Sequence, residues 1–324
     1  MLLHIARRLY PDIPAVFSNT GLEYPEIQKF VRSFDNVDIV TPAMRFDEVV
    51  TKYGYPLIGK EVGEAIWASR KINPKRRRET DHQRTALLGK RTFDGGKSMY
   101  NKEKWLPLAY ETPFLISKEC CAKMKKQPMN SYKSKKHYKM IVATLAEESL
   151  MRKQSWIAHG CNSFDGANSK SQPMAFWTEQ DVLSYIVKYD LPIASVYGEV
   201  VSKCEDGNDY PAKDIMGNVG CNLKCTGCQR TGCIFCAFGL HSEKTGKTRF
   251  QSLAETHPRQ YEYAIGGGQW ADNPHYDPTA PEYDGEWKNW NPKKIWTPSK
   301  KGLGLGKAFD MVNEIYGKDF IRYK

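Results

Sequence analysis

The residues best suited to do chemistry are the cysteines between positions 220 and 241. Five of the nine cysteines of this 324-residue chain lie there, at Cys221, Cys225, Cys228, Cys233 and Cys236. The last four form two Cys-x-x-Cys pairs that are separated by four residues. A Cys-x-x-Cys turn directs two thiols toward one point, which is the geometry that metal chelation or a disulfide needs. Arg230 adds a fixed positive charge that favours thiolates or a bound anion.

Three kinds of site compete for these cysteines. A zinc site normally joins two Cys-x-x-Cys pairs through a dozen or more residues, and the bridge Gln229–Gly232 is much shorter. Free thiols or a redox dithiol are the second kind, because cysteine is also a common small buried residue. An iron–sulfur cluster is the third, and the adjacent Cys120 and Cys121 favour it. Their side chains diverge, whereas a cubane offers separated iron corners to thiolates from distant parts of a chain.

Composition and charge narrow the class of protein. Hydrophobic residues make up 40% of the chain, and no apolar run approaches the roughly 20 residues of a membrane span. The net charge of +11, concentrated in 70–104 and 118–139, favours an anionic partner: nucleic acid, a phosphorylated small molecule, or only solvent around a charged surface. The number of cysteines is odd, they are clustered, and the chain is long enough for a large core. These features indicate a protein of the reducing cytoplasm rather than a secreted disulfide protein.

Strands and helices alternate along the first part of the chain. Apolar periodicity and turn residues predict helices at 2–9, 25–34 and 46–53 and strands at 15–18 and 37–40. Such alternation predicts an α/β fold, a Rossmann-like parallel sheet with helices on both faces. In such sheets ligands bind beyond the carboxyl ends of the strands, where residues 19–23 follow the first predicted strand.

Later elements are less regular. Residues 54–104 form a basic, irregular insertion with predicted turns at 59–61 and 94–98. Gly-Gly-Lys-Ser in the second turn is not a phosphate loop, because no hydrophobic strand precedes it and the pattern's first glycine is missing. Farther along, we expect a helix at 114–126 carrying Cys120 and Cys121, strands at 141–144 and 173–177, and helices at 147–159, 178–189 and 308–316, with a capping box from Thr178 to Asp181.

Changes in composition predict three segments. Residues 1–192 form the α/β domain, 193–265 a cysteine-rich iron–sulfur segment, and 266–324 a tail rich in Trp, Pro and Lys. Tryptophans of the tail either stack on nucleic-acid bases or pin the tail onto a domain. Burial tendencies favour pinning for Trp270, Trp287, Trp290 and Trp296.

With these pieces in order, the sequence resembles the phosphoadenosine phosphosulfate (PAPS) reductase family, of the adenine-nucleotide alpha-hydrolase type. Thr20–Glu26 is similar to the family's Thr-Gly-x-x-x-Pro-Glu turn after its second strand. Glu148–Arg152 is similar to its Glu-Ser-x-x-Arg helix start, and Phe176–Tyr185 resembles its Trp-x-x-x-Asp-Val segment. The matches cover most of residues 1–250.

The resemblance implies thiol-dependent reduction of a sulfonucleotide (PAPS or APS) to sulfite, with a thiol reductant such as thioredoxin. It places Thr20, Gly21 and Glu23 near the adenine nucleotide and Ser149 and Arg152 near its phosphates. Arg152 is the best-placed cation, followed by Lys118 and Lys60. Iron–sulfur members hold a 4Fe–4S cluster with a Cys-Cys pair and a distant Cys-x-x-Cys, which carries over to Cys120, Cys121, Cys233 and Cys236. Cys225 and Cys228 are then left as alternative ligands or as the catalytic dithiol.

Three departures from the family pattern stand out. The family's first strand and its Ser-Gly-Gly-Lys-Asp-Ser loop have no counterpart, because Met1–Ala6 is similar to the helix that follows them. We expect an in-frame upstream extension to encode both, since a sheet without that strand keeps a hole. Ala143–Leu145 stands where the family has Gly-x-Arg. No cysteine follows Cys236, whereas reductases carry their nucleophile in Glu-Cys-Gly-Leu-His, of which Phe238–His241 matches only the end.

Two other functions remain open at this point. An ATP pyrophosphatase-type enzyme would adenylate a substrate and relay sulfur; in nucleic-acid sulfur modification the basic segments would hold the polyanion. A non-catalytic nucleic-acid-binding protein would use the fold as a scaffold. Salt-sensitive binding without nucleotide turnover distinguishes this last function from the two enzymes.

The cysteine pattern generates a direct test. Purified without oxygen, the protein is expected to be brown and to contain iron and acid-labile sulfide. Alanine at Cys120, Cys121, Cys233 or Cys236 is expected to abolish the colour, because each substitution removes one ligand. Alanine at Cys161 or Cys204 serves as the control and leaves it. Stoichiometric zinc in place of iron, with Cys120 and Cys121 dispensable, would instead identify a local zinc site.

Overall fold

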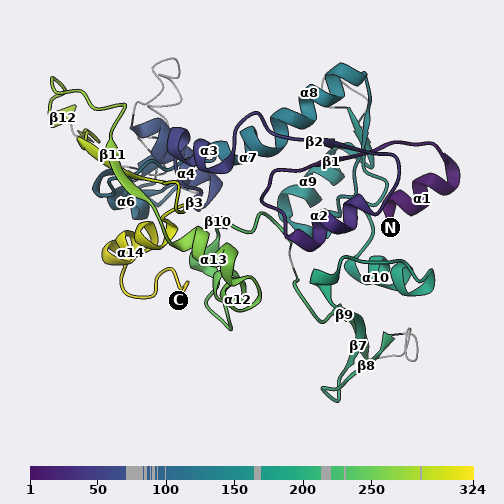
Figure 1. Ribbon diagram of the computed structural model, residues 1–324. Helices are drawn as coiled ribbons and strands as arrows, with labels where there is room; N and C mark the ends of the chain where they lie inside the picture. Colours follow the sequence, from purple (N-terminus) through teal and green to yellow (C-terminus); the bar gives the residue numbers. More distant parts are fainter. Residues whose placement is uncertain are drawn as a thin grey trace. The chain divides into compact units, whose positions relative to one another are not determined.

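The computed structural model describes residues 1–70, 83, 86–87, 89, 92, 94–98, 100–163, 169–212, 220–229, 231–284 and 287–324. They form two compact units, each built from two stretches of chain: unit 1 is Met1–Thr41 with Gln127–Cys233, and unit 2 is Pro42–Lys126 with Ile234–Lys324. Both units combine parallel strand pairs with helices (Figure 1), which confirms the predicted α/β class. Within the described ranges no helix is both long and apolar enough to cross a membrane.

The first four elements of unit 1 follow the predicted alternation closely. They are α1 (Leu2–Leu9), β1 (Ala15–Ser18), α2 (Pro25–Arg32) and β2 (Val37–Val40). Proline suits the first turn of α2, because a helix leaves that N–H without an internal partner in any case. β1 and β2 pair in parallel from Ala15 opposite Val37 to Ser18 opposite Val40. The turn after β1 therefore lies at the carboxyl edge of this strand pair.

An apolar cavity of about 640 Å³ lies against β1 and is lined by α1, α2 and residues 186–197. Among the described strands, β2 is the only one hydrogen-bonded to β1. Ser18 Oγ and Arg7 Nε are buried without a hydrogen-bond partner in this part of unit 1. A parallel strand normally has a neighbour on each side, so β1 presents an open edge. The upstream strand expected from the sequence stays a prediction.

The second half of unit 1 departs from expectation in two places. β4 (Met140–Ile141) is shorter than the predicted strand at 141–144, and it pairs with β6 (Lys170–Ser171), which also pairs with β5 (Asn162–Ser163). The strand predicted at 173–177 is wrong: those residues form turns, and buried Met174 and Ala175 supplied the apolar signal. The capping box from Thr178 to Asp181 is confirmed at the start of α10 (Glu179–Lys188). The other elements here are α8 (Gln127–Lys136), η4 (Ala146–Glu148) and α9 (Leu150–His159).

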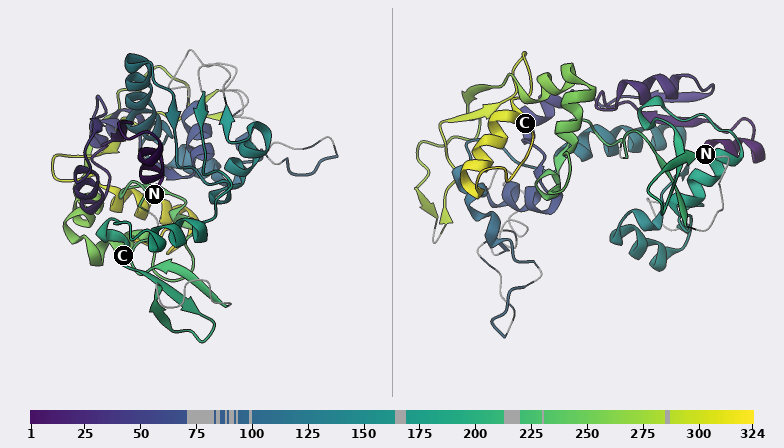
Figure 2. Two further views of the ribbon diagram at one scale, coloured as in Figure 1. Left: turned by 90° about the vertical axis from the view of Figure 1, so that its right-hand side faces the viewer. Right: turned by 90° about the horizontal axis from the view of Figure 1, so that it is seen from below.

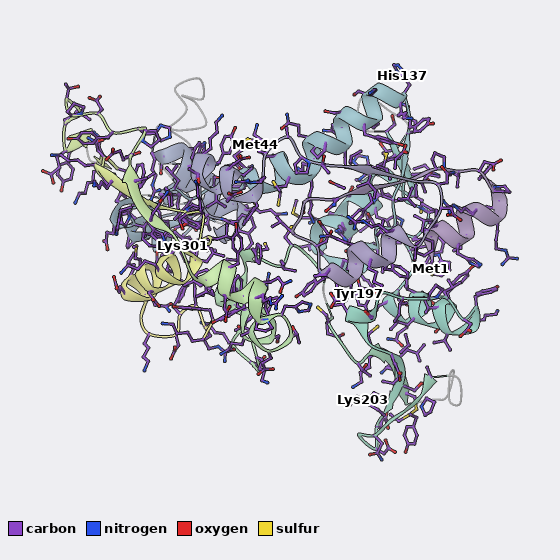
Figure 3. All side chains as sticks on the ribbon, in the orientation of Figure 1. Met1, Met44, His137, Tyr197, Lys203 and Lys301 are labelled. Carbon is purple, nitrogen blue, oxygen red and sulfur yellow. A yellow bond between two sulfur atoms is a disulfide. The ribbon has the colours of Figure 1, made fainter. Side chains whose placement is uncertain are left out.

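Unit 1 ends in a three-stranded antiparallel sheet that projects from its other elements (Figures 1 and 2). Its order is β8 (Asp209–Pro211), β7 (Val200–Cys204), β9 (Cys221–Cys225), preceded by η5 (Ser195–Tyr197). Figure 3 labels Tyr197, the last residue of η5, and Lys203, near the end of β7. The Gln180 side chain of α10 bonds both the N–H and the C=O of Leu223, each at 2.8 Å. This amide therefore anchors β9 to α10.

Unit 2 is mostly helical around short strands. α3 (Phe46–Tyr53) is confirmed, but the predicted turn at 59–61 opens α4 (Lys60–Ser69). The helix predicted at 114–126 begins only at Glu119: α7 (Glu119–Cys121) continues as a π-helical turn, Ala122–Lys126. Its remaining elements are β3 (Leu57–Ile58), η2 (Glu103–Trp105), α6 (Leu106–Glu111), β10 (Ala237–Phe238), η6 (Leu240–Ser242), α12 (Arg249–Thr256), α13 (Pro258–Ile265), β11 (Gln269–Asp272), β12 (Tyr283–Asp284), β13 (Trp287–Lys288), β14 (Lys294–Thr297) and α14 (Leu305–Tyr316).

Residues 54–58, the central segment, connect distant parts of unit 2. On one side Tyr55 bonds the backbone of residues 115 and 117, at 2.8 and 3.3 Å. On the other side β3 pairs in parallel with β10, and Gly239 N–H donates to the Ile58 carbonyl at 2.7 Å. The Tyr55 hydroxyl donates to the Leu303 carbonyl at 2.7 Å. Three stretches far apart in sequence thus meet at one buried segment.

Trp290 and Trp296 hold the tail of unit 2 in place, as predicted, whereas Trp270 is 48% exposed and the Trp287 side chain lies outside the described part of the structure. Trp290 is buried and its Nε1–H donates to the Thr112 carbonyl at 2.8 Å. Its ring also faces the Arg70 guanidinium at 4.2 Å. Arg70 is buried and donates to the carbonyls of Ala109 and Phe114, each at 2.7 Å, and burial lowers its pKa to about 9. Trp296 Nε1–H donates to the Gly304 carbonyl at 2.8 Å.

Gly54 offers a test of the central segment. Its φ is +104°, and an added Cβ would overlap the Leu115 carbonyl. Gly54→Ala is expected to lower the free energy of unfolding by roughly 2–5 kcal/mol, from the left-handed backbone and the overlap together. Gly246, with φ +62° and no atom within 4 Å of an added Cβ, is the control, and Gly246→Ala should cost about 1–2 kcal/mol. Equal losses in urea unfolding would contradict the close approach.

Candidate functional site

The turn after β1 holds the predicted nucleotide contacts Thr20, Gly21 and Glu23. Buried Glu23 accepts from the Thr20 N–H at 2.9 Å and from the Thr20 hydroxyl at 2.8 Å. Gly21 N–H donates to Asn19 Oδ1 at 3.1 Å, and Leu22 N–H donates to Thr20 Oγ1 at 3.2 Å. These three amides are therefore committed within the turn. Exposed Gly21, with no atom within 4 Å of an added Cβ, leaves room for a ligand to approach the backbone.

Ser149 and Arg152 lie together at the start of α9. Ser149 caps the helix, accepting from the Arg152 N–H at 3.3 Å. The Arg152 guanidinium pairs with the Glu148 carboxylate. The sequence predicted Glu148 within a helix at 147–159, but it belongs to η4, before α9 begins. A phosphate bound at Arg152 would compete with this carboxylate. The phosphate carries a larger negative charge and three acceptor oxygens, so it can replace the carboxylate as the partner of Arg152.

Cys225 and Cys228 lie on a rigid turn that follows β9. The amides of residues 226, 227 and 228 donate to the carbonyls of 199, 197 and 196 at 2.9, 2.8 and 2.9 Å. An added Cβ at Gly227 would overlap the Val196 carbonyl, so only glycine allows this packing. Burial raises the pKa of the Cys225 thiol, and the Glu179 carboxylate adds to the effect. Cys225 is thus a protonated thiol near neutral pH.

The central segment brings Cys120, Cys121 and Cys236 into one region of unit 2. Residue 116 bridges to Tyr55 on one side, and α7 with its two cysteines follows directly. β10, on the other side, begins one residue after Cys236. Cys121 and Cys236 are close enough to interact electrostatically. Sequence positions more than one hundred residues apart therefore supply thiols to the same place.

Charges in this region favour a thiolate at Cys121. A hydrogen bond from the Cys120 thiol lowers the Cys121 pKa to about 6, assisted by the positive charges of Lys60, Lys125 and Lys126. Burial raises the pKa of Cys236, against a hydrogen bond from the Phe238 amide. Lys60 thus acts on the cysteines, although the resemblance suggested only a phosphate-binding cation. Lys118, the other lysine singled out, pairs with Glu64.

The fourth predicted ligand, Cys233, is the last residue of unit 1. Two residues separate it from Cys236 in the sequence. No group of three His, Cys, Asp or Glu side chains in the described part of the chain converges closely enough to be assigned to a metal ion. Arg230 lies outside the described residues, as do all the lysines and arginines between 71 and 91.

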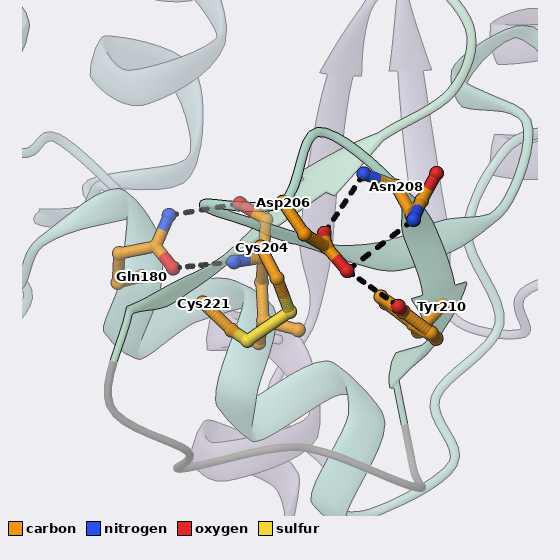
Figure 4. Close-up of a disulfide and its surroundings, with 7 residues drawn as sticks. Gln180, Cys204, Asp206, Asn208, Tyr210 and Cys221 are labelled. Atoms are coloured by element: carbon orange, nitrogen blue, oxygen red, sulfur yellow. Dashed lines mark hydrogen bonds between the residues drawn. A yellow bond between two sulfur atoms is a disulfide. The ribbon is translucent and has the colours of Figure 1, made fainter.

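Three further side chains gain a clear assignment from the structure. His241 packs rather than orienting a thiol: it stacks on Phe320 and meets the edge of Trp105, at centroid distances of 5.6 and 5.5 Å. Burial lowers its pKa, assisted by Lys104 and Lys244. Cys204 and Cys221 form a disulfide between β7 and β9 (Figure 4), where the sequence predicted free or metal-bound thiols. Their 17-residue separation gave no signal for pairing.

A known protein family matches most of the chain. A family model described as phosphoadenosine phosphosulfate reductase domain matches residues 1–238. The match spans the turn after β1, the start of α9, the turn at Cys225–Cys228 and all four predicted cluster cysteines. No curated protein sequence matches the chain significantly.

The opposite pKa shifts of two cysteines predict different reactivity in cluster-free protein. Cys121, with a pKa of about 6, is largely a thiolate at pH 7, whereas the raised pKa keeps Cys225 protonated. At pH 7 iodoacetamide is expected to label Cys121 at least tenfold faster, and the Cys225 rate should rise as pH passes 9. Lys60→Gln should slow Cys121 at pH 6, with Lys29→Gln as the control. Equal rates at pH 7, measured by peptide mass spectrometry, would contradict these environments.

Proposed function

This chain belongs to the phosphoadenosine phosphosulfate reductase family, and on that premise we propose that it binds an adenine nucleotide and reduces a sulfonucleotide to sulfite with thiols. The family match over residues 1–238 carries the proposal, because it includes both candidate nucleotide segments and the candidate dithiol. Thr20, Gly21, Glu23, Ser149, Arg152, Cys225 and Cys228 all belong to unit 1.

The two nucleotide segments would divide the ligand between them. Gly21 is exposed on a turn that Glu23 braces from inside, so the nucleoside would contact a stiff surface. Arg152, one helical turn after the Ser149 cap, would meet the phosphates at a helix N-terminus, where the helix dipole favours anions. Arg152 would leave Glu148 as a phosphate takes the place of that carboxylate.

Reduction of a sulfonucleotide needs two thiols. A thiolate attacks the sulfate sulfur, an S–S bond forms, and the nucleoside phosphate leaves with the electron pair of its S–O bond. A second thiolate then attacks the first cysteine's sulfur, which releases sulfite and leaves a disulfide. The raised pKa of Cys225 suits the resolving thiol, so Cys228 is assigned the first attack. Arg152 would stabilise the leaving phosphate.

We also propose, from the chemistry of the thiols in unit 2, that they take part in holding an iron–sulfur cluster. Cys120, Cys121 and Cys236 are thiols of one region, the Cys121 pKa is about 6, and the Phe238 amide bonds the Cys236 sulfur. Thiolate donors with amide hydrogen bonds to sulfur and nearby lysines suit such a cluster, whose net charge is negative. Cys120, Cys121, Cys233 and Cys236 would hold a 4Fe–4S cluster. Bound there, it would supply an electron-transfer or electrostatic group.

Nucleotide handling tests the proposed site. Arg152→Ala is expected to weaken sulfonucleotide binding or turnover at least tenfold, since a lost charge-assisted contact costs roughly 1.5–3 kcal/mol. Lys153→Ala, the next residue of the same helix, is the matched control. The measurements are titration of binding and sulfite release with a dithiol donor. Normal handling by Arg152→Ala would contradict the site, and pyrophosphate release from ATP without sulfite would favour the adenylating enzyme instead.

A further inference from the structure

One pair of cysteines differs from all the others. Cys204 and Cys221 are joined in a disulfide, and the other seven cysteines form none. Cys204 ends β7 and Cys221 begins β9, directly opposite it in the strand register. Both residues are partly exposed, and β9 is one of the two edge strands of this sheet among the described residues. The disulfide thus joins neighbouring strands (Figure 4), and both of its residues are partly open to solvent.

We propose that Cys204 and Cys221 form a thiol–disulfide exchange site whose substrate is a dithiol. The proposal is independent of the sulfonucleotide reaction, because neither cysteine belongs to the candidate dithiol or to the cluster ligands. The residues around the pair explain why it can change between the disulfide and the dithiol form. They also explain why a dithiol is the effective reductant.

The sheet around the pair persists without the S–S bond. β7 faces β9 over five residue pairs, and β8 covers its other edge from Val201 opposite Pro211 to Lys203 opposite Asp209. Leu223, two residues after Cys221, is buried with Leu183 and Ala212, and Gln180 clamps its backbone. After reduction, the two thiols therefore still face each other, because these contacts keep β7 and β9 paired.

Because the two cysteines stay opposite each other, a dithiol reduces the pair more completely than a monothiol does. A thiolate that attacks one sulfur breaks the S–S bond, forms a mixed disulfide and frees the other cysteine as a thiolate. That cysteine stays opposite the mixed disulfide, so it expels a monothiol and restores the starting bond. A dithiol instead completes the exchange with its own second thiol. Two electrons and two protons pass to the protein, and the dithiol becomes a disulfide.

Differential alkylation of the full chain tests the exchange. Air-oxidised protein is equilibrated with mixtures of reduced and oxidised dithiothreitol, or with 2-mercaptoethanol at the same thiol concentration, then quenched and mapped by mass spectrometry. Cys204 and Cys221 are expected to gain label together, as a two-electron couple for which a tenfold change in ratio corresponds to about 30 mV. At least tenfold less label is expected with 2-mercaptoethanol. Far-ultraviolet circular dichroism should not change on reduction.

Controls separate the outcomes. Cys161→Ser removes a partly exposed free cysteine of the same unit and should leave the couple unchanged. The double variant Cys204→Ser, Cys221→Ser should lose it. Labelling of both cysteines without reductant, labelling only after denaturation, or equal reduction by 2-mercaptoethanol would each overturn the proposal. These readouts do not involve sulfite or cluster colour, so failure of the proposed function leaves them interpretable.

Discussion

Unit 2 depends on the backbone pairing around residues 54–58. Tyr55 is bound to one neighbouring stretch and Ile58 to another, so the central segment holds α7 and β10 on its two sides. The bonds are few, but buried backbone groups that lose their partners cost more than a bond between exposed groups contributes. This pairing brings Cys121 and Cys236 close enough to interact. The hydrogen bond from Cys120 and the positive charge of Lys60 lower the pKa of Cys121, which favours its thiolate form.

Local signals predicted local structure well. Helices and strands from α1 to α3 were predictable because apolar periodicity, prolines and short turns all act within a few residues. The apolar stretch at 173–177 led to a wrong strand prediction. Residues such as Met174 and Ala175 give the same apolar pattern whether they are buried in a turn or in a strand. The parallel pairing of β3 with β10 was not predictable: two-residue strands carry no periodicity, and their partners are about 180 residues apart.

The candidate site shows the same limit. Motifs located the turn after β1 and the start of α9, but they did not reveal that Glu23 bonds Thr20 or that Arg152 pairs with Glu148. Spacing grouped Cys225 with Cys228, yet the raised pKa of Cys225 comes from its burial and Glu179. The disulfide of Cys204 follows from strand register, which depends on contacts on both faces of a sheet. Residue types thus identify candidates, and environment sets their reactivity.

The two-part construction of unit 2 has a consequence for protein synthesis. Residues 42–126 leave the ribosome first, but the partner stretch 234–324 follows only after all of 127–233 has been made. At common translation rates that delay is on the order of ten seconds, far longer than a helix needs to form. During this interval Tyr55 lacks Leu303, Thr112 lacks Trp290 and Cys121 lacks Cys236. A nascent chain therefore carries an incomplete, cysteine-bearing half of unit 2 until the last part of translation.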